Sequence, residues 1–214
     1  MIIDHIGYAF FPQEIWLRAI GRLSMPLFCY GITKGFQRCN ESSEFNYKRL
    51  NKYFERLLFF TLISQIPYSF MTSSLNWNIG MTWLCSLFLL KMFDGTYGIK
   101  VKIASLVLAA TINYIFRFDY GMYGCFMCLL IYHFYTKKKE PIKLTLSLIL
   151  LNLLRILGGY SIGSILLQTI SIFAVLLLFF LEKYDSKIKL PKKTYYIAYP
   201  LHMLVIVFIK LFIN

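Results

Sequence analysis

The chain has 214 residues, of which 58% are hydrophobic and only 15% are charged, and its mean hydropathy is +0.59. Soluble domains carry about 25% charged residues, so this composition excludes an ordinary water-soluble globule and indicates a protein whose solvent is lipid. The formal net charge of +13 comes from lysines and arginines that stand between apolar runs, which is typical of membrane topology and argues against nucleic-acid binding.

Apolar runs follow one another along the whole chain, so we predict one all-α domain over residues 1–214, a polytopic transmembrane helix bundle with about eight or nine hydrophobic segments. The segments are 1–12, 15–37, 54–72, 78–93, 98–116, 120–135, 142–158, 161–182 and 195–213. A helix needs about 20 residues to cross a bilayer. The first segment is too short for this: either its neighbours hold it as a half-helix, or Met1 is internal and the true start lies upstream.

Basic residues gather at every second connection between these segments. The basic clusters lie around 34–56, 91–102, 137–143 and 183–193, whereas the connections with almost no basic residue are 72–77, 117–119 and 158–161. Lysine-rich connections of membrane proteins stay in the cytoplasm. The pattern therefore predicts a multi-pass protein of the inner (cytoplasmic) membrane, with the N-terminus in the cytoplasm and the C-terminus outside.

The cysteines do not indicate a metal or redox site. Cys125 and Cys128 form a CxxC pair, but the pair lies in an apolar stretch without further Cys or His residues at ligand spacing. Zinc and redox sites need such partners and a polar setting. We therefore predict that these residues pack between helices and that the protein has no metal.

Several polar or titratable side chains lie inside the apolar segments. Inserting a charged group costs about 2.5–3.5 kcal/mol, so each needs a partner or a function. The candidates are Asp4, His5, Arg22, Gln65, Asn78, Asp119, Tyr120 and His202. The predicted topology puts most of them in the outer half or the middle of the membrane, with His202 nearer the inner face. Polar groups at similar depth on several helices predict an enclosed, hydrated cavity.

Purely structural interpretations remain open for these residues. Asp4 and Arg22 can form a structural ion pair, and Gln65 and Asn78 can form the hydrogen bonds that often join membrane helices. Asp119 can be an exposed loop residue.

His5 is the best candidate for chemistry because an imidazole can accept a proton from an amine and return it to a leaving thiolate. This suits acyl transfer, with Asp4 orienting the ring or balancing its charge and with Arg22, Gln65 or Asn78 donating to an anionic oxygen. Neighbouring helical residues point about 100° apart, so Asp4 cannot bond the His5 ring directly and is expected to pair with Arg22.

A set of short stretches resembles the TraX family, whose namesake is associated with acetylation of the N-terminus of conjugative-pilus subunits. The stretches are Asp4-His5-Ile6, Gly21-Arg22 with Pro26-Leu27-Phe28, Arg49-Leu50 or Arg56-Leu57, Ser64-Gln65-Ile66-Pro67-Tyr68, Asn78, Tyr120-Gly121 with Tyr123-Gly124, and Tyr199-Pro200-Leu201-His202. They cover nearly the whole chain in the family's order. The family's first helix normally has further residues before the Asp-His pair, which this chain lacks.

The resemblance implies a membrane acyltransferase that moves acetyl from acetyl-CoA to an amine such as a peptide or pilin N-terminus. It implies that His5 is the catalytic base, beside Asp4, and that the remaining site residues, which bind substrate or donor, are Arg22, Gln65, Asn78, Tyr120 and His202. The alternative is a small proton-coupled transporter or membrane-embedded binding protein that uses Asp4, His5 and Arg22 as a relay. A structural subunit of a larger complex is a third possibility.

Overall fold

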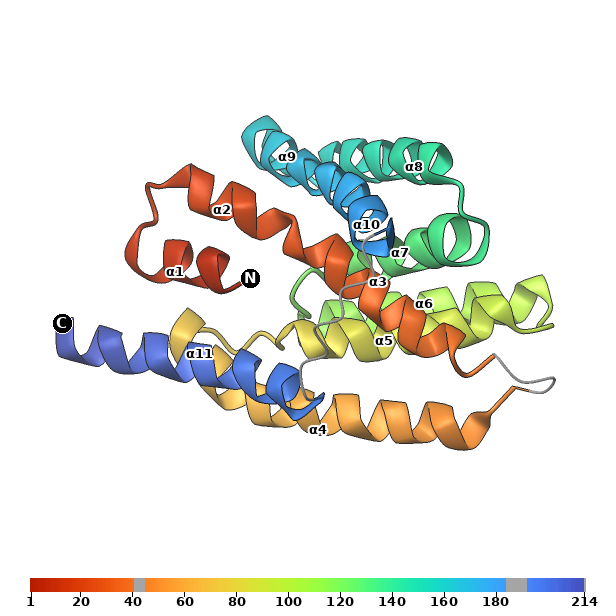
Figure 1. The fold of residues 1–214 in the computed structure, drawn as a ribbon, viewed down its shortest axis with the longest axis horizontal. Helices are drawn as coiled ribbons and strands as arrows, with labels where there is room; N and C mark the ends of the chain where they lie inside the picture. The colour runs from red at the N-terminus through yellow and green to blue at the C-terminus, as the bar shows by residue number, and fades with distance from the viewer. Residues whose placement is uncertain (41–44, 184–191, 214) are drawn as a thin grey trace.

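The computed structural model describes residues 1–40, 45–183 and 192–213, and all regular structure in these ranges is helical (Figure 1). The α-helices are α1 (Ile2–Phe10), α2 (Ile15–Arg22), α3 (Ser24–Gln37), α4 (Tyr47–Thr72), α5 (Ile79–Asp94), α6 (Ile99–Phe116), α7 (Gly121–Leu130), α8 (Pro141–Leu153), α9 (Ile162–Thr169), α10 (Phe173–Lys183) and α11 (Lys192–Ile213). A π-helix, η1 (Ile131–Lys137), continues α7, and two short 3₁₀ turns are η2 (Leu154–Ile156) and η3 (Ile170–Ile172). The all-α prediction is confirmed for the described part of the chain.

Two predicted segments are each divided into two helices. Segment 15–37 breaks at Leu23, and Pro26 explains the break because it has no N–H to bond the carbonyl of Arg22. The Ser24 hydroxyl donates to the carbonyl of Gly21 at 2.6 Å and satisfies one carbonyl at the break. Segment 161–182 is interrupted by η3 between α9 and α10.

The connections between helices lie at two opposite ends of the bundle. At one end, the carboxylate of Asp94 accepts from Asn40 at 2.5 Å and from Lys137 at 2.8 Å, which joins the ends of α3, α5 and η1. At the other end, Trp77 and Phe118 form an isolated bridge between the connections that precede α5 and α7. The basic connections 34–56, 91–102 and 137–143 thus share one end, while Lys187 and Lys189 of the fourth cluster lie outside the described residues.

Much of the bundle surface is apolar. Tyr114, Leu157 and Phe212 are each more than four-fifths exposed, and large aliphatic side chains of α6, α8 and α11 are exposed beside them. By its length and composition, α6 is able to cross a bilayer, and no second helix in the described residues meets both requirements. Shorter apolar helical stretches cover Ile162–Leu178 and Ile197–Ile213.

Helix α1 is short, as predicted, and folds back against α2 while its other side contacts α11. Figure 1 shows the N-terminus between α2 and α11, well inside the length of the bundle. This arrangement brings the Asp4-His5 pair from the beginning of the chain beside helices from its end.

Candidate active site

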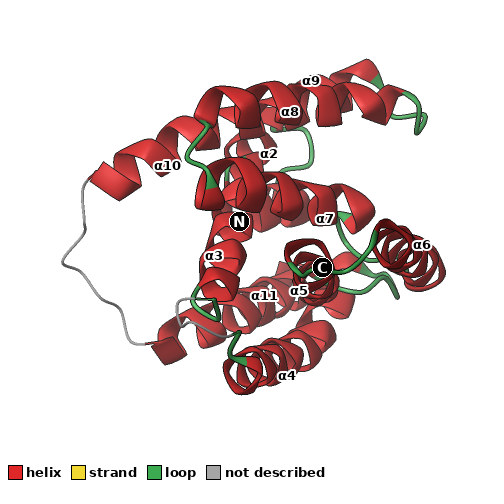
Figure 2. Cartoon of the chain, turned by 90° about the vertical axis from the view of Figure 1, so that its right-hand side faces the viewer, coloured by secondary structure: helices red, strands yellow, loops and turns green. Residues whose placement is uncertain are grey.

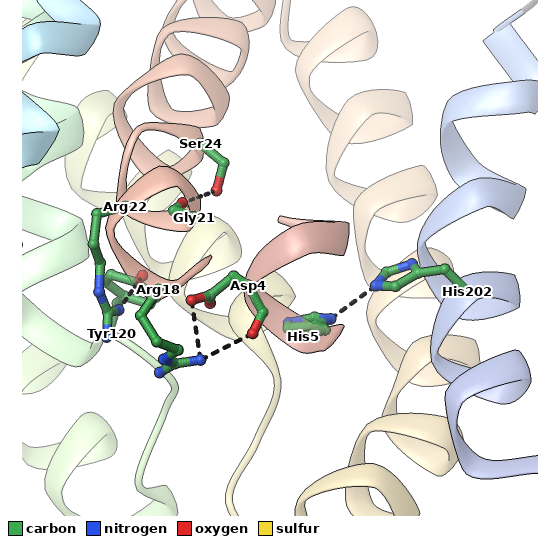
Figure 3. A network of polar contacts seen from close by, with 8 residues as sticks. All are labelled: Asp4, His5, Arg18, Gly21, Arg22, Ser24, Tyr120 and His202. Carbon is green, nitrogen blue, oxygen red and sulfur yellow. Dashed lines mark hydrogen bonds and ion pairs between the residues drawn. The ribbon is translucent and has the colours of Figure 1, made fainter. Parts of the chain in front are cut away.

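The centre of the site is a pair of histidines that are 197 positions apart in the sequence. His5 Nδ1 of α1 lies 2.7 Å from His202 Nε2 of α11, and the two rings stack with centroids 5.0 Å apart (Figure 3). The sequence predicted His202 nearer the inner face than His5, whereas this contact puts the two rings at the same level of the bundle. His202 lies about 15 Å along α11, near the middle of that helix.

The hydrogen bonds of this pair fix the proton positions in the two neutral rings. His202 Nδ1 lies 2.9 Å from the carbonyl oxygen of Ala198, which only accepts, so Nδ1 carries the proton. His202 Nε2 is then the acceptor, and His5 Nδ1 donates to it. The remaining nitrogen, His5 Nε2, keeps a free lone pair and is the basic atom of the pair.

Asp4 pairs with Arg18, not with Arg22 as the sequence predicted. Arg18 Nη1 lies 3.0 Å from Asp4 Oδ1 and donates to the backbone carbonyl of Asp4 at 3.2 Å. Arg18 and Arg22 are one helical turn apart on α2, and Asp4 lies against Gly21 between them, where a Cβ would collide with its carboxyl group. Asp4 therefore anchors α1 to α2, and His202 rather than Asp4 orients the His5 ring.

Arg22 instead holds Tyr120. Its Nη1 donates to the Tyr120 hydroxyl at 2.7 Å, and its guanidinium lies over the same ring at 5.7 Å. Tyr120 has φ of 60°, a left-handed conformation that is uncommon for a bulky residue. The preceding residue, Asp119, is held by α5 and by the connection before it, since its N–H donates to the carbonyl of Trp77 at 2.9 Å and its carbonyl accepts from Thr82. The position of Tyr120 is thus set by α2, by α5 and by the connection that precedes α5.

Gln65 and Asn78 belong to a separate network between α4 and α5. Gln65 Oε1 accepts from the N–H of Asn78 at 2.9 Å and from its Nδ2 at 3.0 Å, while Gln65 Nε2 donates to the carbonyl of Asn76 at 2.9 Å. Asn78 also bonds the carbonyl of Thr61 and caps α5 at Gly80. These contacts match the structural interpretation of the two residues; their role in substrate binding stays a prediction.

A small cavity of about 30 Å³ adjoins His5. Its polar wall includes Asp4, His5, Trp83, Asp119, Tyr120 and Tyr199. The indole N–H of Trp83 is buried and has no hydrogen-bond partner among the described residues. The cavity has the volume of about one water molecule, so it accommodates a small group beside the base and not a long acyl chain.

A second cavity, of about 1290 Å³, lies against α6, α7 with η1, and α8. Figure 2 shows α7 between α6 and α8 when the bundle is viewed from its end. The cavity extends from Asp94, Lys102 and Lys137 at the lysine-rich end to Asp119 and Tyr120. Because the latter two residues line both cavities, Tyr120 stands at the boundary between the large cavity and the space beside His5.

The sequence interpretation missed Arg18, Trp83 and Tyr199 as residues of the site. Two of the three carried a signal in their spacing. Arg18 precedes Arg22 by four residues and Tyr199 precedes His202 by three, so each shares a helix face with a candidate that had been recognised. Trp83 lies in an apolar run, and nothing in its local sequence distinguishes it from a core residue.

The chain is similar to known proteins over nearly its whole length. The family model described as TraX protein matches residues 1–210. "Probable fimbrial assembly protein FimC, serogroup H1" of Dichelobacter nodosus is 26% identical over 247 residues, a match that covers all of this chain and 92% of that protein. No solved structure matches the chain. The chain belongs to the TraX family.

Proposed function

We propose that this protein is a membrane-embedded acetyltransferase that moves an acetyl group from acetyl-CoA to an amine, such as the N-terminus of a fimbrial or pilin subunit. The observation that carries the proposal is the Ala198–His202–His5 chain of hydrogen bonds, which leaves the basic nitrogen of His5 free beside a small cavity. Membership of the TraX family and the likeness to a protein named for fimbrial assembly support the choice of acceptor.

The reaction needs a base, an anion stabiliser and an acid, and the site offers candidates for each. The amine nitrogen attacks the thioester carbonyl as His5 Nε2 accepts the amine proton. The Tyr120 hydroxyl and the Arg22 guanidinium that holds it stabilise the oxyanion that forms. When the carbon–sulfur bond breaks, His5 returns the proton to the thiolate, so an amide and free coenzyme A are the products and the enzyme is unchanged.

We place the bundle in the inner membrane with its lysine-rich end in the cytoplasm, where coenzyme A thioesters are available. The apolar surface of the bundle and the gathering of basic connections at one end support this orientation. In this orientation α1 runs from the cytoplasmic side toward the outer face, and α11 ends at the outer face.

A reconstitution experiment distinguishes this function from proton-coupled transport. We expect purified protein in liposomes, given acetyl-CoA and no ion gradient, to acetylate the α-amine of a short peptide. One coenzyme A thiol should be released for each amide formed. The readouts are the mass of the peptide, thiol release and a pH-sensitive dye inside the liposomes, and a peptide with a blocked N-terminus is the control. Proton flux coupled to uptake of a solute, with no amide formed, would establish the transporter instead.

A further inference from the structure

A second polar cluster lies in the interior of the bundle, outside the histidine site. The Tyr123 hydroxyl of α7 donates to Asn152 Oδ1 of α8 at 2.8 Å, and Gln168 of α9 and Ser171 of η3 lie beside the same hydroxyl. Asn152 and Gln168 are 1% and 2% exposed. These residues are polar positions within the apolar segments 142–158 and 161–182, and the mechanism above does not use them.

Several donors of this region have no acceptor among the described residues. Gln168 Nε2 is buried and lies near the Tyr123 hydroxyl without a hydrogen bond of ordinary length and angle, and Nδ2 of Asn113 on α6 is buried and unpartnered. A buried donor without a partner costs about 1–3 kcal/mol, so each such group calls for an explanation. Both residues line the large cavity, Gln168 from α9 and Asn113 from α6.

The unpartnered groups on the wall of this cavity are alike in kind. Within the described residues they are Gln168 Nε2, Asn113 Nδ2 and Arg22 Nε, and all three are N–H donors. A wall of free donors fits a ligand that carries acceptor oxygens, such as amide carbonyls. A purely hydrocarbon chain would leave these groups unsatisfied.

The lysine-rich end of the large cavity indicates a second property of the ligand, a group that can pair with a cation. Lys137 is paired there with Asp94 at 2.8 Å, whereas Lys102 forms no ion pair with any described residue. The wall between this end and Tyr123 is largely apolar, with Leu106, Phe126 and Leu130. Along η1 and α7 this stretch is about 20 Å long. The cavity therefore offers a cation, then an apolar passage, then carboxamide donors, and finally Tyr120.

We infer that the large cavity is the binding site for the coenzyme A portion of the donor. The diphosphate lies by Lys102, the dimethyl part of the pantetheine arm lies in the apolar passage, and the two amide carbonyls accept from Gln168 and Asn113. The thioester then reaches Tyr120 at the boundary with the small cavity. This inference rests on the proposed function for the identity of the donor, and it assigns the arm's recognition to residues outside the histidine site.

Equilibrium binding of coenzyme A, phosphopantetheine and ADP to the purified full-length protein tests the assignment. We expect Gln168→Leu and Asn113→Leu each to lower the affinity for coenzyme A and for phosphopantetheine about three- to tenfold, the usual effect of losing one neutral hydrogen bond, and to leave the affinity for ADP unchanged. Lys102→Ala should lower the affinity for both coenzyme A and ADP. Gln13→Leu, in the exposed connection between α1 and α2, is the matched control and should bind all three as the wild type does.

Thermal unfolding separates recognition from packing. If Gln168 Nε2 serves the ligand rather than the fold, Gln168→Leu should unfold at about the same temperature as the wild type. The inference would be overturned if both variants, Gln168→Leu and Asn113→Leu, kept the wild-type affinity for coenzyme A. It would also be overturned if the variants lost as much affinity for ADP as for coenzyme A, or if the wild type did not bind coenzyme A. Binding as expected with no amide formed would refute the proposed function alone, while amide formation with unchanged affinity in both variants would refute only this subsite.

Discussion

His5→Ala lowers kcat for acetyl transfer by about 10²–10⁴, the usual effect of losing one positioned general base. The expectation follows from the hydrogen bonds of the pair, which direct the free lone pair of His5 Nε2 away from His202. Binding of coenzyme A should change little, because His5 lines the small cavity and not the large one. Steady-state kinetics of the purified variant, with the donor affinity measured separately, give both quantities.

His133→Ala is the matched control for this variant. The His133 side chain is exposed near the lysine-rich end of the bundle, where its ring packs edge-on against Phe134. Its removal should leave kcat at saturating acetyl-CoA within about twofold of the wild type, since His133 lines the lysine-rich end of the large cavity and not the small cavity beside His5. If His5→Ala keeps more than half of the wild-type kcat, the base is another group.

His202→Leu lowers kcat by about a hundredfold and leaves KM for acetyl-CoA nearly unchanged. His202 accepts from His5 Nδ1, and without this acceptor the His5 ring is free to rotate and to carry its proton on Nε2, which removes the basic lone pair. Because His202 acts through His5, we regard it as a positioning residue. Kinetic analysis with both substrates varied separates the effect on kcat from any effect on KM.

His202→Gln tests whether the hydrogen bond or the packing of the ring matters. The glutamine carboxamide has an acceptor oxygen that can reach the place of His202 Nε2, whereas leucine fills similar space without an acceptor. We expect the kcat of His202→Gln to be at least tenfold higher than the kcat of His202→Leu. Equal loss in the two variants, with normal thermal unfolding of both, would show that His202 does not act as the acceptor for His5.

The helices themselves were largely predictable from the sequence, because each apolar run is long enough to form one and short polar or basic connections separate the runs. The break at Leu23 was not predicted, although its cause, Pro26, is visible in the sequence. Proline inside a membrane helix is often tolerated, so the pattern alone does not say where a helix ends. Here the break matters, because it places Arg22 at the end of α2, beside Tyr120.

The candidate site was predictable in some of its members but not in its pairings, and Gln65 and Asn78 lie in a separate network. Asp4, His5, Arg22, Tyr120 and His202 do converge, yet the partner of Asp4 is Arg18 and the partner of Arg22 is Tyr120. Two arginines one turn apart look equivalent in a sequence, and only the packing of α1 against α2 decides between them. Similarly, the contact between the two histidines depends on how α1 and α11 align, which no local pattern encodes.

The most direct test of the central claim, that His202 and Ala198 leave His5 Nε2 free to act as the base, is nitrogen-15 NMR of the histidine side chains. The chain has three histidines, so His133→Ala removes the signals of the unrelated ring, and adding His202→Gln tells those of His5 from those of His202. At a pH where both rings are neutral, we predict that His5 and His202 each carry their proton on Nδ1 and that His5 Nε2 is unprotonated. A His5 ring protonated at Nε2 would contradict the relay and the assignment of His5 as the base.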